Sequence, residues 1–192
     1  MKIIPRYEFR AWGDDLDLAQ ARLLELGTGL ERRQTGEVYI VSRAEETNVK
    51  IRAGILDIKR LLDRRNRLER WKPVFKVAFP VESQVLSTSV FPLLDVEAPP
   101  PAAGLLSEEE FVAVADRLEG MMAVPVQKAR SLVSIGDCRG EAGIVTVDGG
   151  RYPTVAVESA DPSAVEETIA LLGIGGHPNE SYPALLRRLR WA

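Results

Sequence analysis

The chain of 192 residues has few of the side chains that build redox centres and multi-histidine metal sites. Cys138 is its one cysteine, which excludes an intrachain disulfide and a cysteine metal cluster and fits a reducing cytosol. His177 is its one histidine, which excludes multi-histidine sites and argues against Ser-His-Asp chemistry. We therefore interpret His177 as a loop residue and assign Cys138 no redox or nucleophilic role.

Long apolar runs and a strong excess of one charge are also missing. No run of about 18 apolar residues occurs, so we expect no transmembrane helix. The first residues, MKIIPRYEFR, lack the apolar core of a signal peptide and already suit a strand. The net charge of -3 argues against a general nucleic-acid binder. We expect a cytoplasmic protein without nucleic-acid or membrane partners.

Two short strands with charge on one face are predicted within residues 47–62, TNVKIRAGILDIKRLL. Apolar and charged residues alternate strictly on both sides of Ala53-Gly54, as they do in half-buried strands. The charged faces carry Lys50, Arg52 and Lys59. Like charges on neighbouring strands repel, so this face indicates an anionic partner or a wide hydrated space.

Further strands and helices follow from periodicity and from start and stop signals. Strands are predicted at 6–11, 37–42, 72–81, 124–135, 143–148 and 153–158, and helices at 14–26, 107–120, 161–172 and 182–190. Ser107 and Glu110 form a capping box, and Asp161-Pro162 suits a helix start. Gly149-Gly150 is typical of a hairpin turn, and the charged residues 63–70 suit a helical turn or a mobile basic loop.

Proline and alanine dominate residues 87–106, with PPPAAG at the centre. Neither flank alone has enough strands to close a core, so we interpret this segment as a linker inside one domain that spans residues 1–192. Strands outnumber helices, which predicts an α+β fold dominated by antiparallel sheet. A closed barrel with helices outside would place the charges around a hydrated lumen that suits a polyphosphate. An open sheet with one solvated face explains the same alternation.

The order of the motifs resembles the CYTH superfamily of triphosphate tunnel metalloenzymes, which includes class IV adenylate cyclases, thiamine triphosphatases and inorganic triphosphatases. The matching segments are RYEFR near the start, the paired VKIR and LDIK, and VQKAR in a later strand. The run VAVESADPSAVEETIALLGI, followed by ESYPALL, resembles the final strand and helices of the family.

The resemblance implies an eight-stranded antiparallel tunnel that binds a triphosphate through inward cations, with glutamates of the first and last strands holding Mg²⁺ or Mn²⁺. Carried over by position, the metal ligands would be Glu8 and Glu158. The phosphate ligands would be Arg10, Lys50, Arg52, Lys59, Lys128 and Arg130.

Two positions depart from the family pattern. The first strand has Arg6, Glu8 and Arg10 where the family has Glu-x-Glu-x-Lys, and the last strand has Ala156 where the family has a first glutamate. One acid remains at each end, which is compatible with one weak metal site and not with two. We expect Arg6 to pair with Glu8. Glu8 and Glu158 also suit a structural role as partners of Arg6 and of the lumen cations.

The predicted function is the binding, and the metal-dependent hydrolysis, of a triphosphate or another phosphorylated small molecule. The alternative is a catalytically inactive module that binds polyphosphate or nucleotide for regulation. An interaction protein that uses the basic segment 63–70 and the Pro-Ala linker is a third class.

Overall fold

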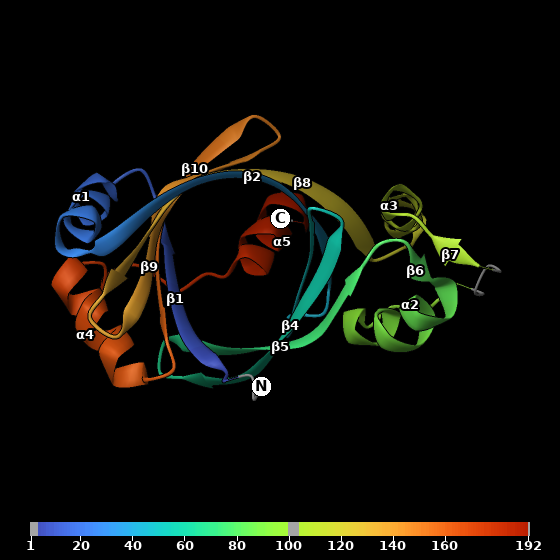
Figure 1. Ribbon diagram of the computed structural model, residues 1–192, viewed down its shortest axis with the longest axis horizontal. Coiled ribbons are helices and arrows are strands. Elements are labelled where there is room, and N and C mark those ends of the chain that lie inside the picture. The colour runs from blue at the N-terminus through green and yellow to red at the C-terminus, as the bar shows by residue number, and fades with distance from the viewer. Residues whose placement is uncertain (1–3, 100–103, 192) are drawn as a thin grey trace. The chain divides into compact units, whose positions relative to one another are not determined.

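In a computed structural model that describes residues 4–99 and 104–191, eight antiparallel strands form a closed barrel (Figure 1). These strands are β1 (Arg6–Trp12), β2 (Thr28–Ser42), β3 (Thr47–Arg52), β4 (Ile55–Arg65), β5 (Leu68–Ala78), β8 (Met121–Ile135), β9 (Cys138–Val147) and β10 (Gly150–Ser159). Their order is β1-β10-β9-β8-β2-β3-β4-β5. The closed barrel confirms the predicted tunnel-like α+β fold and excludes the open sheet.

The described residues also form five α-helices, a 3₁₀ helix and a two-stranded sheet. They are α1 (Asp17–Leu26), α2 (Ser83–Ser89), α3 (Glu108–Arg117), α4 (Pro162–Leu172), α5 (Tyr182–Trp191), the 3₁₀ helix Phe91–Leu94, β6 (Val81–Glu82) and β7 (Leu105–Leu106). Two predicted helix starts are confirmed. Ser107 and Glu110 form the capping box before α3, and the Asp161 side chain accepts a hydrogen bond from the Ser163 amide at 2.9 Å before α4.

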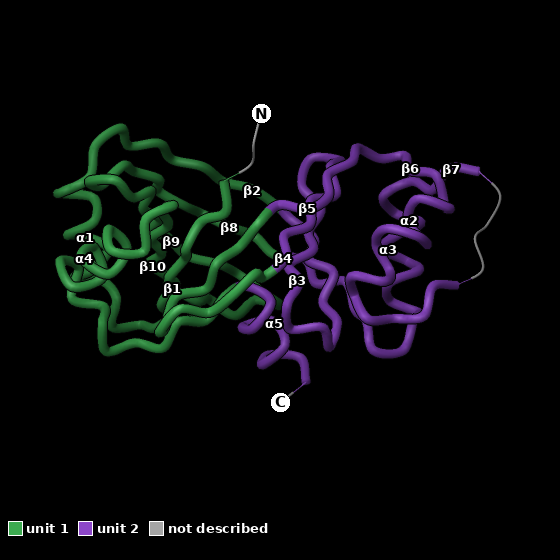
Figure 2. The backbone as a smooth tube through the Cα atoms, turned by 90° about the horizontal axis from the view of Figure 1, so that it is seen from below, with its two compact units in different colours: residues 1–36, 61–72, 126–181 green, residues 37–60, 73–125, 182–192 purple. Residues whose placement is uncertain are grey.

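Contacts divide the chain into two compact units (Figure 2), of which unit 1 contains residues 1–36, 61–72 and 126–181. Its apolar core lies between the helices α1 and α4 and one face of β1, β9 and β10 (Figure 1). Fully buried members of this core include Phe9, Leu23, Val157, Val165 and Ile169. Because side chains alternate along a strand, Arg6, Glu8 and Arg10 of β1 and Glu158 of β10 lie on the opposite face.

Unit 2 contains residues 37–60, 73–125 and 182–192. Its apolar core joins one face of β3 and β4 to α2, α3 and the 3₁₀ helix, with Ile51, Ile58 and Phe111 fully buried. The ring of Tyr182, at the start of α5, stacks on Tyr39 with 5.4 Å between the centroids. Four strands, β2, β4, β5 and β8, contribute residues to both units.

The prediction of a helical turn or basic loop for residues 63–70 is wrong. β4 continues to Arg65 and β5 begins at Leu68, so this charged segment is the end of a β-hairpin. Asn66 adopts φ 54° at the turn, a conformation that asparagine tolerates well. Arg70 pairs with Asp63 at 3.2 Å and Arg64 with Glu69 at 3.5 Å, so the charges compensate one another along the two arms.

Other boundaries differ in ways that the sequence pattern explains. β2 begins at Thr28 and not at residue 37. The prediction missed the first half of this strand because that half is solvent-exposed and shows no apolar alternation. Val147 pairs with Gly150, so the hairpin turn is Asp148-Gly149 and not Gly149-Gly150. Within the segment 87–106, α2 ends at Ser89 and the 3₁₀ helix follows, while residues 100–103 of the proline-alanine centre lie outside the described residues. Across the described ranges, no helix has the length and apolar character needed to span a bilayer.

Candidate functional site

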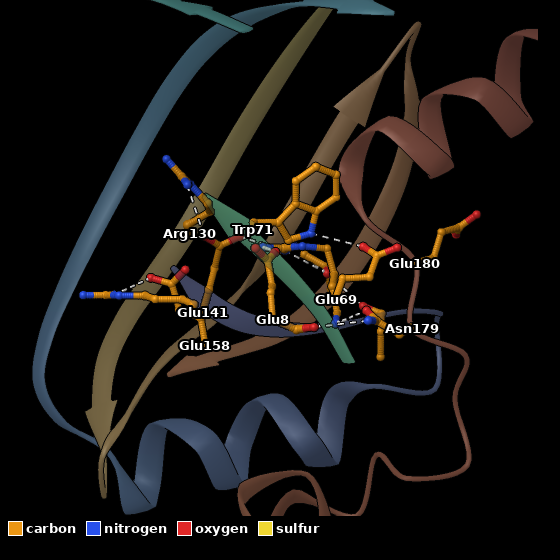
Figure 3. Close-up of polar contacts among 12 residues, drawn as sticks. Glu8, Glu69, Trp71, Arg130, Glu141, Glu158, Asn179 and Glu180 are labelled. Atoms are coloured by element: carbon orange, nitrogen blue, oxygen red, sulfur yellow. Dashed lines mark hydrogen bonds and ion pairs between the residues drawn. The ribbon is translucent and has the colours of Figure 1, made fainter. Parts of the chain in front are cut away.

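Charged side chains of unit 1 gather on the face of β1, β8, β9 and β10 that lies away from the apolar core (Figure 3). The strand register explains this grouping: Arg10 pairs with Ala156, and Ala156 pairs with Glu141. Residues in direct register share a face of a sheet. We call the following set the unit 1 cluster: Glu8, Arg10, Lys128, Arg130 and Glu141.

Glu141 of β9 lies at the centre of the unit 1 cluster. Its Oε1 accepts a hydrogen bond from Arg10 Nη1 at 2.9 Å, and its Oε2 accepts one from Arg130 Nη1 at 3.1 Å. Burial raises the pKa of Glu141, but the charges of Arg10, Arg130 and Lys128 lower it further, so that it falls to about 2. Glu141 is therefore a carboxylate at every ordinary pH.

The cations of the unit 1 cluster are buried as well. Arg10 is 5% exposed and Lys128 is 2% exposed. Arg10 also donates from Nη1 to the Thr154 hydroxyl at 3.2 Å and from Nη2 to Glu8 at 3.4 Å. Arg130 donates from Nη2 to the Thr35 hydroxyl at 3.2 Å. Protein oxygens thus accept hydrogen bonds from both terminal nitrogens of each guanidinium group.

Glu8 and Glu158, the predicted metal ligands, lie directly opposite each other in the register of β1 and β10. Each is held by an arginine: Glu158 accepts from Arg6 at 2.8 Å and Glu8 from Arg10 at 3.4 Å. The expectation that Arg6 pairs with Glu8 is therefore wrong. Arg6 reaches across to the neighbouring strand, because Glu8 already faces the more deeply buried Arg10.

These two glutamates are a poor fit to the divalent cation that the fold family implies. Within residues 4–99 and 104–191, no three acidic, histidine or cysteine side chains come close enough to share a metal ion. A cation at Glu8 and Glu158 would also lie beside the guanidinium groups of Arg6 and Arg10 and would compete with them.

Glu69 of β5 extends this row of acids and was not singled out from the sequence. It pairs with Glu8 in the register of β1 and β5, so the three glutamates 158, 8 and 69 lie on three adjacent strands. Burial raises the pKa of Glu69, and the nearby Glu8 raises it further, against hydrogen bonds from Trp71 and Ser181. Trp71 Nε1 donates to Glu69 at 3.2 Å.

A cleft of about 610 Å³ is lined by residues of β1, β2, β8, β9 and β10. Arg6 and Glu158 line it, together with Leu132, Ser134 and Arg139. Leu132 pairs with Glu141 in the register of β8 and β9. Two residues that line the cleft, Glu158 and Leu132, are thus register partners of the cluster residues Glu8 and Glu141.

Unit 2 has a charge cluster of its own, formed by the predicted strand pair 47–62. Lys50 lies opposite both Tyr39 and Asp57 in the register, on the face away from the apolar core of unit 2. The Glu37 side chain is 0% exposed, and its carboxylate lies 3.6 Å from Lys50 Nζ and 3.5 Å from Arg52 Nη1. We call the following set the unit 2 cluster: Glu37, Lys50, Arg52, Asp57 and Lys59.

The cations of the unit 2 cluster differ in how firmly they are held. Burial lowers the pKa of Lys50, and the neighbouring Lys59 and Arg52 lower it further, while Glu37 raises it. The Arg52 side chain is 42% exposed. Lys59 lies opposite Asn48 and makes no ion pair with any residue in the described part of the chain.

The segment before α5 fixes the backbone of β1 in unit 1. The Asn179 Oδ1 accepts from the Arg10 amide at 2.8 Å, and its Nδ2 donates to the Glu8 carbonyl at 3.1 Å and to the Arg67 carbonyl at 2.8 Å. The Glu180 amide donates to the Arg10 carbonyl at 3.0 Å. β1 pairs with β5 over residues 6–8, so these bonds continue its hydrogen bonding beyond that pairing.

The structure thus divides the six predicted phosphate ligands into two groups, Arg10, Lys128 and Arg130 in unit 1 and Lys50, Arg52 and Lys59 in unit 2. The sequence patterns did not indicate the two glutamates at their centres, the buried Glu37 and the partly buried Glu141. Glu37 was taken as the first residue of a strand, although it continues the alternation of Tyr39 with the apolar Val38 and Ile40. Glu141 stands among glycines and alanine in CRGEAGIV, where no apolar alternation marks its face.

Comparison with solved structures supports the fold. A candidate adenylate cyclase from Bacillus halodurans aligns over 100% of both chains, with a TM-score of 0.56 and 12% identity. A candidate adenylyl cyclase from Hippeastrum, reported to have a dominant triphosphatase activity, aligns over 98% of this chain and 96% of its own, with a TM-score of 0.52 and 14% identity.

No family model matches the sequence, and no curated protein matches it. The structural comparison therefore defines the class by fold: the chain has the closed eight-stranded barrel of the CYTH tunnel proteins. The resemblance that the sequence motifs predict is confirmed at this level.

Proposed function

We propose that each of the two charge clusters is a binding site within its own unit for a triphosphate or another phosphorylated small molecule, held by the cations of that cluster. The observation that carries the proposal is the grouping itself: all six cations lie in two clusters, each around a glutamate, on strand faces that point away from the apolar cores. Arginine and lysine are the side chains that proteins use most to hold phosphate.

The cost of burying these charges supports a role in ligand binding. A buried ion pair adds little stability compared with apolar side chains of similar volume, because desolvation of the charges offsets their attraction. Barrel strands that served the fold alone would be as stable with apolar or neutral residues at these positions. Strongly shifted pKa values, such as that of Glu141, also concentrate at functional sites.

Binding of tripolyphosphate, measured by isothermal titration calorimetry at 0.05 M and 0.2 M salt, tests the proposal. We expect heat of binding, a rise in melting temperature with ligand, and weaker binding at higher salt. The charge-reducing variant Lys59→Met should weaken binding, while Lys72→Met, an exposed residue of β5, serves as its control. Absence of binding for tripolyphosphate, ATP and thiamine triphosphate alike would reject the proposed function.

Metal-dependent hydrolysis is a second candidate, favoured by the triphosphatase activity of the Hippeastrum protein. Phosphate release from the same ligands with Mg²⁺ or Mn²⁺ distinguishes the two candidates. A hydrolase should lose turnover in Glu8→Gln and Glu158→Gln. A binding module should release no phosphate with either ion, and calorimetry with Mn²⁺ alone should show no site.

A further inference from the structure

We infer that a groove of unit 1 beside α1 is a binding site for a small organic anion, a molecule with one carboxylate or phosphate group on an apolar body. The groove has a volume of about 480 Å³ and is lined by residues of α1, β2, β8 and β9. A volume of this order is typical of sites for small molecules. This site is an addition to the proposed function and does not depend on it.

The groove lies on the strand face opposite to that of the unit 1 cluster. Its lining residues Ala129 and Ser131 flank Arg130 along β8, so their side chains point away from the cluster. Arg130 donates to the hydroxyl of Thr35 in β2, which places Gln34 and Arg32 of that strand on the groove side as well. A ligand in the groove would therefore contact a different set of side chains from a ligand at the cluster.

The groove carries positive charge, and Arg32 is the cation that it offers to a ligand. Its lining residues, all of them in the described part of the chain, include no aspartate or glutamate. Arg32 is exposed and makes no hydrogen bond or ion pair with any described residue. The neighbouring Arg33 is held by Glu31, to which its Nη2 donates at 2.8 Å. Arg32 thus keeps its planar fork of donors for an anion, and one such fork matches one carboxylate or phosphate group.

Neutral polar side chains in the groove can complete the binding of that group. Gln34 and Ser131 also line the groove, and neither makes a hydrogen bond within the described ranges. Their amide and hydroxyl groups can donate to the oxygens of an anion. Gln20 of α1 is held in place, because its Nε2 donates to the carbonyls of Gly143 at 3.1 Å and Thr154 at 3.2 Å.

The remaining lining is apolar, which predicts the rest of the ligand. Ala129 and Ala142 have small side chains that leave space, and Leu24 and Ile144 add larger apolar ones. Leu24 is 37% exposed, so a ligand that covers it removes apolar surface from water. A polyphosphate would gain nothing from this surface. The groove therefore suits a single anionic group joined to an apolar body.

A titration followed by nuclear magnetic resonance tests this site with three probes: benzoate, phenyl phosphate and the neutral benzamide. The Nε–H signal of Arg32 and the backbone amide signal of Ser131 should shift with at least one of the two anions, with a dissociation constant of roughly 1 mM or lower. Benzamide should bind at least roughly tenfold more weakly. The tighter of the two anions identifies the preferred group as a carboxylate or a phosphate.

Four variants test the roles of charge and shape, with the Ser131 amide signal as the readout. Arg32→Met should weaken binding of the preferred anion by roughly tenfold or more, and Arg32→Lys, which keeps the charge without the planar fork, by less. Ala129→Phe should weaken it similarly to Arg32→Met, because the ring fills the groove from an exposed strand position. Arg22→Met, at an exposed arginine of α1 that does not line the groove, should change nothing.

The outcomes distinguish this site from the charge clusters. The inference is wrong if neither anion shifts the two signals up to about 10 mM, if benzamide binds as tightly as the anions, or if Arg32→Met leaves binding unchanged. Phenyl phosphate bound at a charge cluster would remain bound in Arg32→Met. The proposed function depends on tripolyphosphate binding and its loss in Lys59→Met, so either result can fail while the other holds.

Discussion

Both charge clusters contain a glutamate with cations around it, but the distances between the glutamate and its cations differ. In unit 1, Glu141 receives short hydrogen bonds of 2.9 Å and 3.1 Å from two arginines. In unit 2, Glu37 lies 3.6 Å from Lys50 and 3.5 Å from Arg52, distances at the edge of hydrogen bonding. The unit 1 cations are fixed by protein oxygens, and the unit 2 cations keep more of their capacity for a ligand.

The types of side chain account for this difference. Two planar guanidinium groups can each direct an N–H at a separate carboxylate oxygen of Glu141, which gives good geometry. Lys50 is an ammonium on a flexible stem whose charge is disfavoured by burial, and Arg52 is partly exposed to water. We therefore expect unit 1 to contribute more to stability and unit 2 to contribute more to ligand affinity.

Removal of each glutamate provides the most direct test of this comparison. Glu141→Ala leaves two arginines buried without their main partner, and should lower the free energy of unfolding by about 3–5 kcal/mol. Glu37→Ala should lower it by about 1–2 kcal/mol, because Arg52 can turn to water. Urea unfolding of both variants measures the values, and equal losses would contradict the proposed difference between the clusters.

Acid should lower the stability of the protein mainly through Glu141 in unit 1. The pKa of Glu141 is about 2 in the folded protein, below its ordinary value of 4.5, so the fold favours the ionised carboxylate. The stability that this carboxylate contributes is complete above pH 4.5 and is lost as the pH falls through the folded pKa near 2. The full effect is about 3 kcal/mol.

Unfolding free energies of the wild type and Glu141→Gln between pH 6 and pH 2 isolate this contribution. The difference between the two proteins should be constant down to about pH 4.5 and should shrink below it. Other carboxylates titrate in the same range, but they do so in both proteins and cancel in the difference. A difference that stays constant to pH 2 would show that Glu141 has an ordinary pKa.

The affinity for tripolyphosphate should depend most on the unit 2 cluster. Lys59 makes no ion pair within the part of the chain that the structure describes, so a ligand can use its full charge. Lys59→Met should weaken tripolyphosphate binding roughly tenfold, about 1.4 kcal/mol, and should leave the unfolding free energy within about 0.5 kcal/mol of the wild type. An unchanged affinity for tripolyphosphate would show that Lys59 of the unit 2 cluster does not bind this ligand.

Substitution of Glu69 should have the smallest effect, and the pKa of Glu69 is shifted in the direction opposite to that of Glu141. Burial and the neighbouring Glu8 raise its pKa in the folded protein, so the fold favours the protonated acid. Glu69→Gln should therefore stabilise the protein at neutral pH, by up to about 1 kcal/mol, and this gain should disappear as the pH falls below the ordinary glutamate value. Thermal unfolding at pH 7 and pH 4 measures it, and destabilisation at pH 7 would contradict the direction.

Local patterns predicted much of the fold. Alternation around Ala53-Gly54 located β3 and β4, and the caps at Ser107 and Asp161 located α3 and α4, because each signal lies within a few residues of its effect. The 63–70 hairpin was missed because its charged arms hide the strand period, and its turn depends on the single residue Asn66.

The cations of the candidate site could be predicted from the sequence, but their partners could not. Lys50 and Arg52 share a strand, and the resemblance to a family supplied the other positions. Arg10 and Glu141 are 131 residues apart, and only the register of β1, β10 and β9 brings them together. The register between strands that are distant in the sequence leaves no local signal, so the glutamate partners of these cations could be identified only from the structure.

The bonds made by Asn179 have a practical consequence for experiments on this protein. Its amide ties the main chain at Glu8, Arg10 and Arg67, so the strand that presents Glu8 and Arg10 is positioned without help from their side chains. Substitutions at these two residues should leave the path of β1 unchanged. Each can then be interpreted as a change in chemical function at a fixed point in space, which makes β1 well suited to chemical rescue with guanidine or small carboxylic acids.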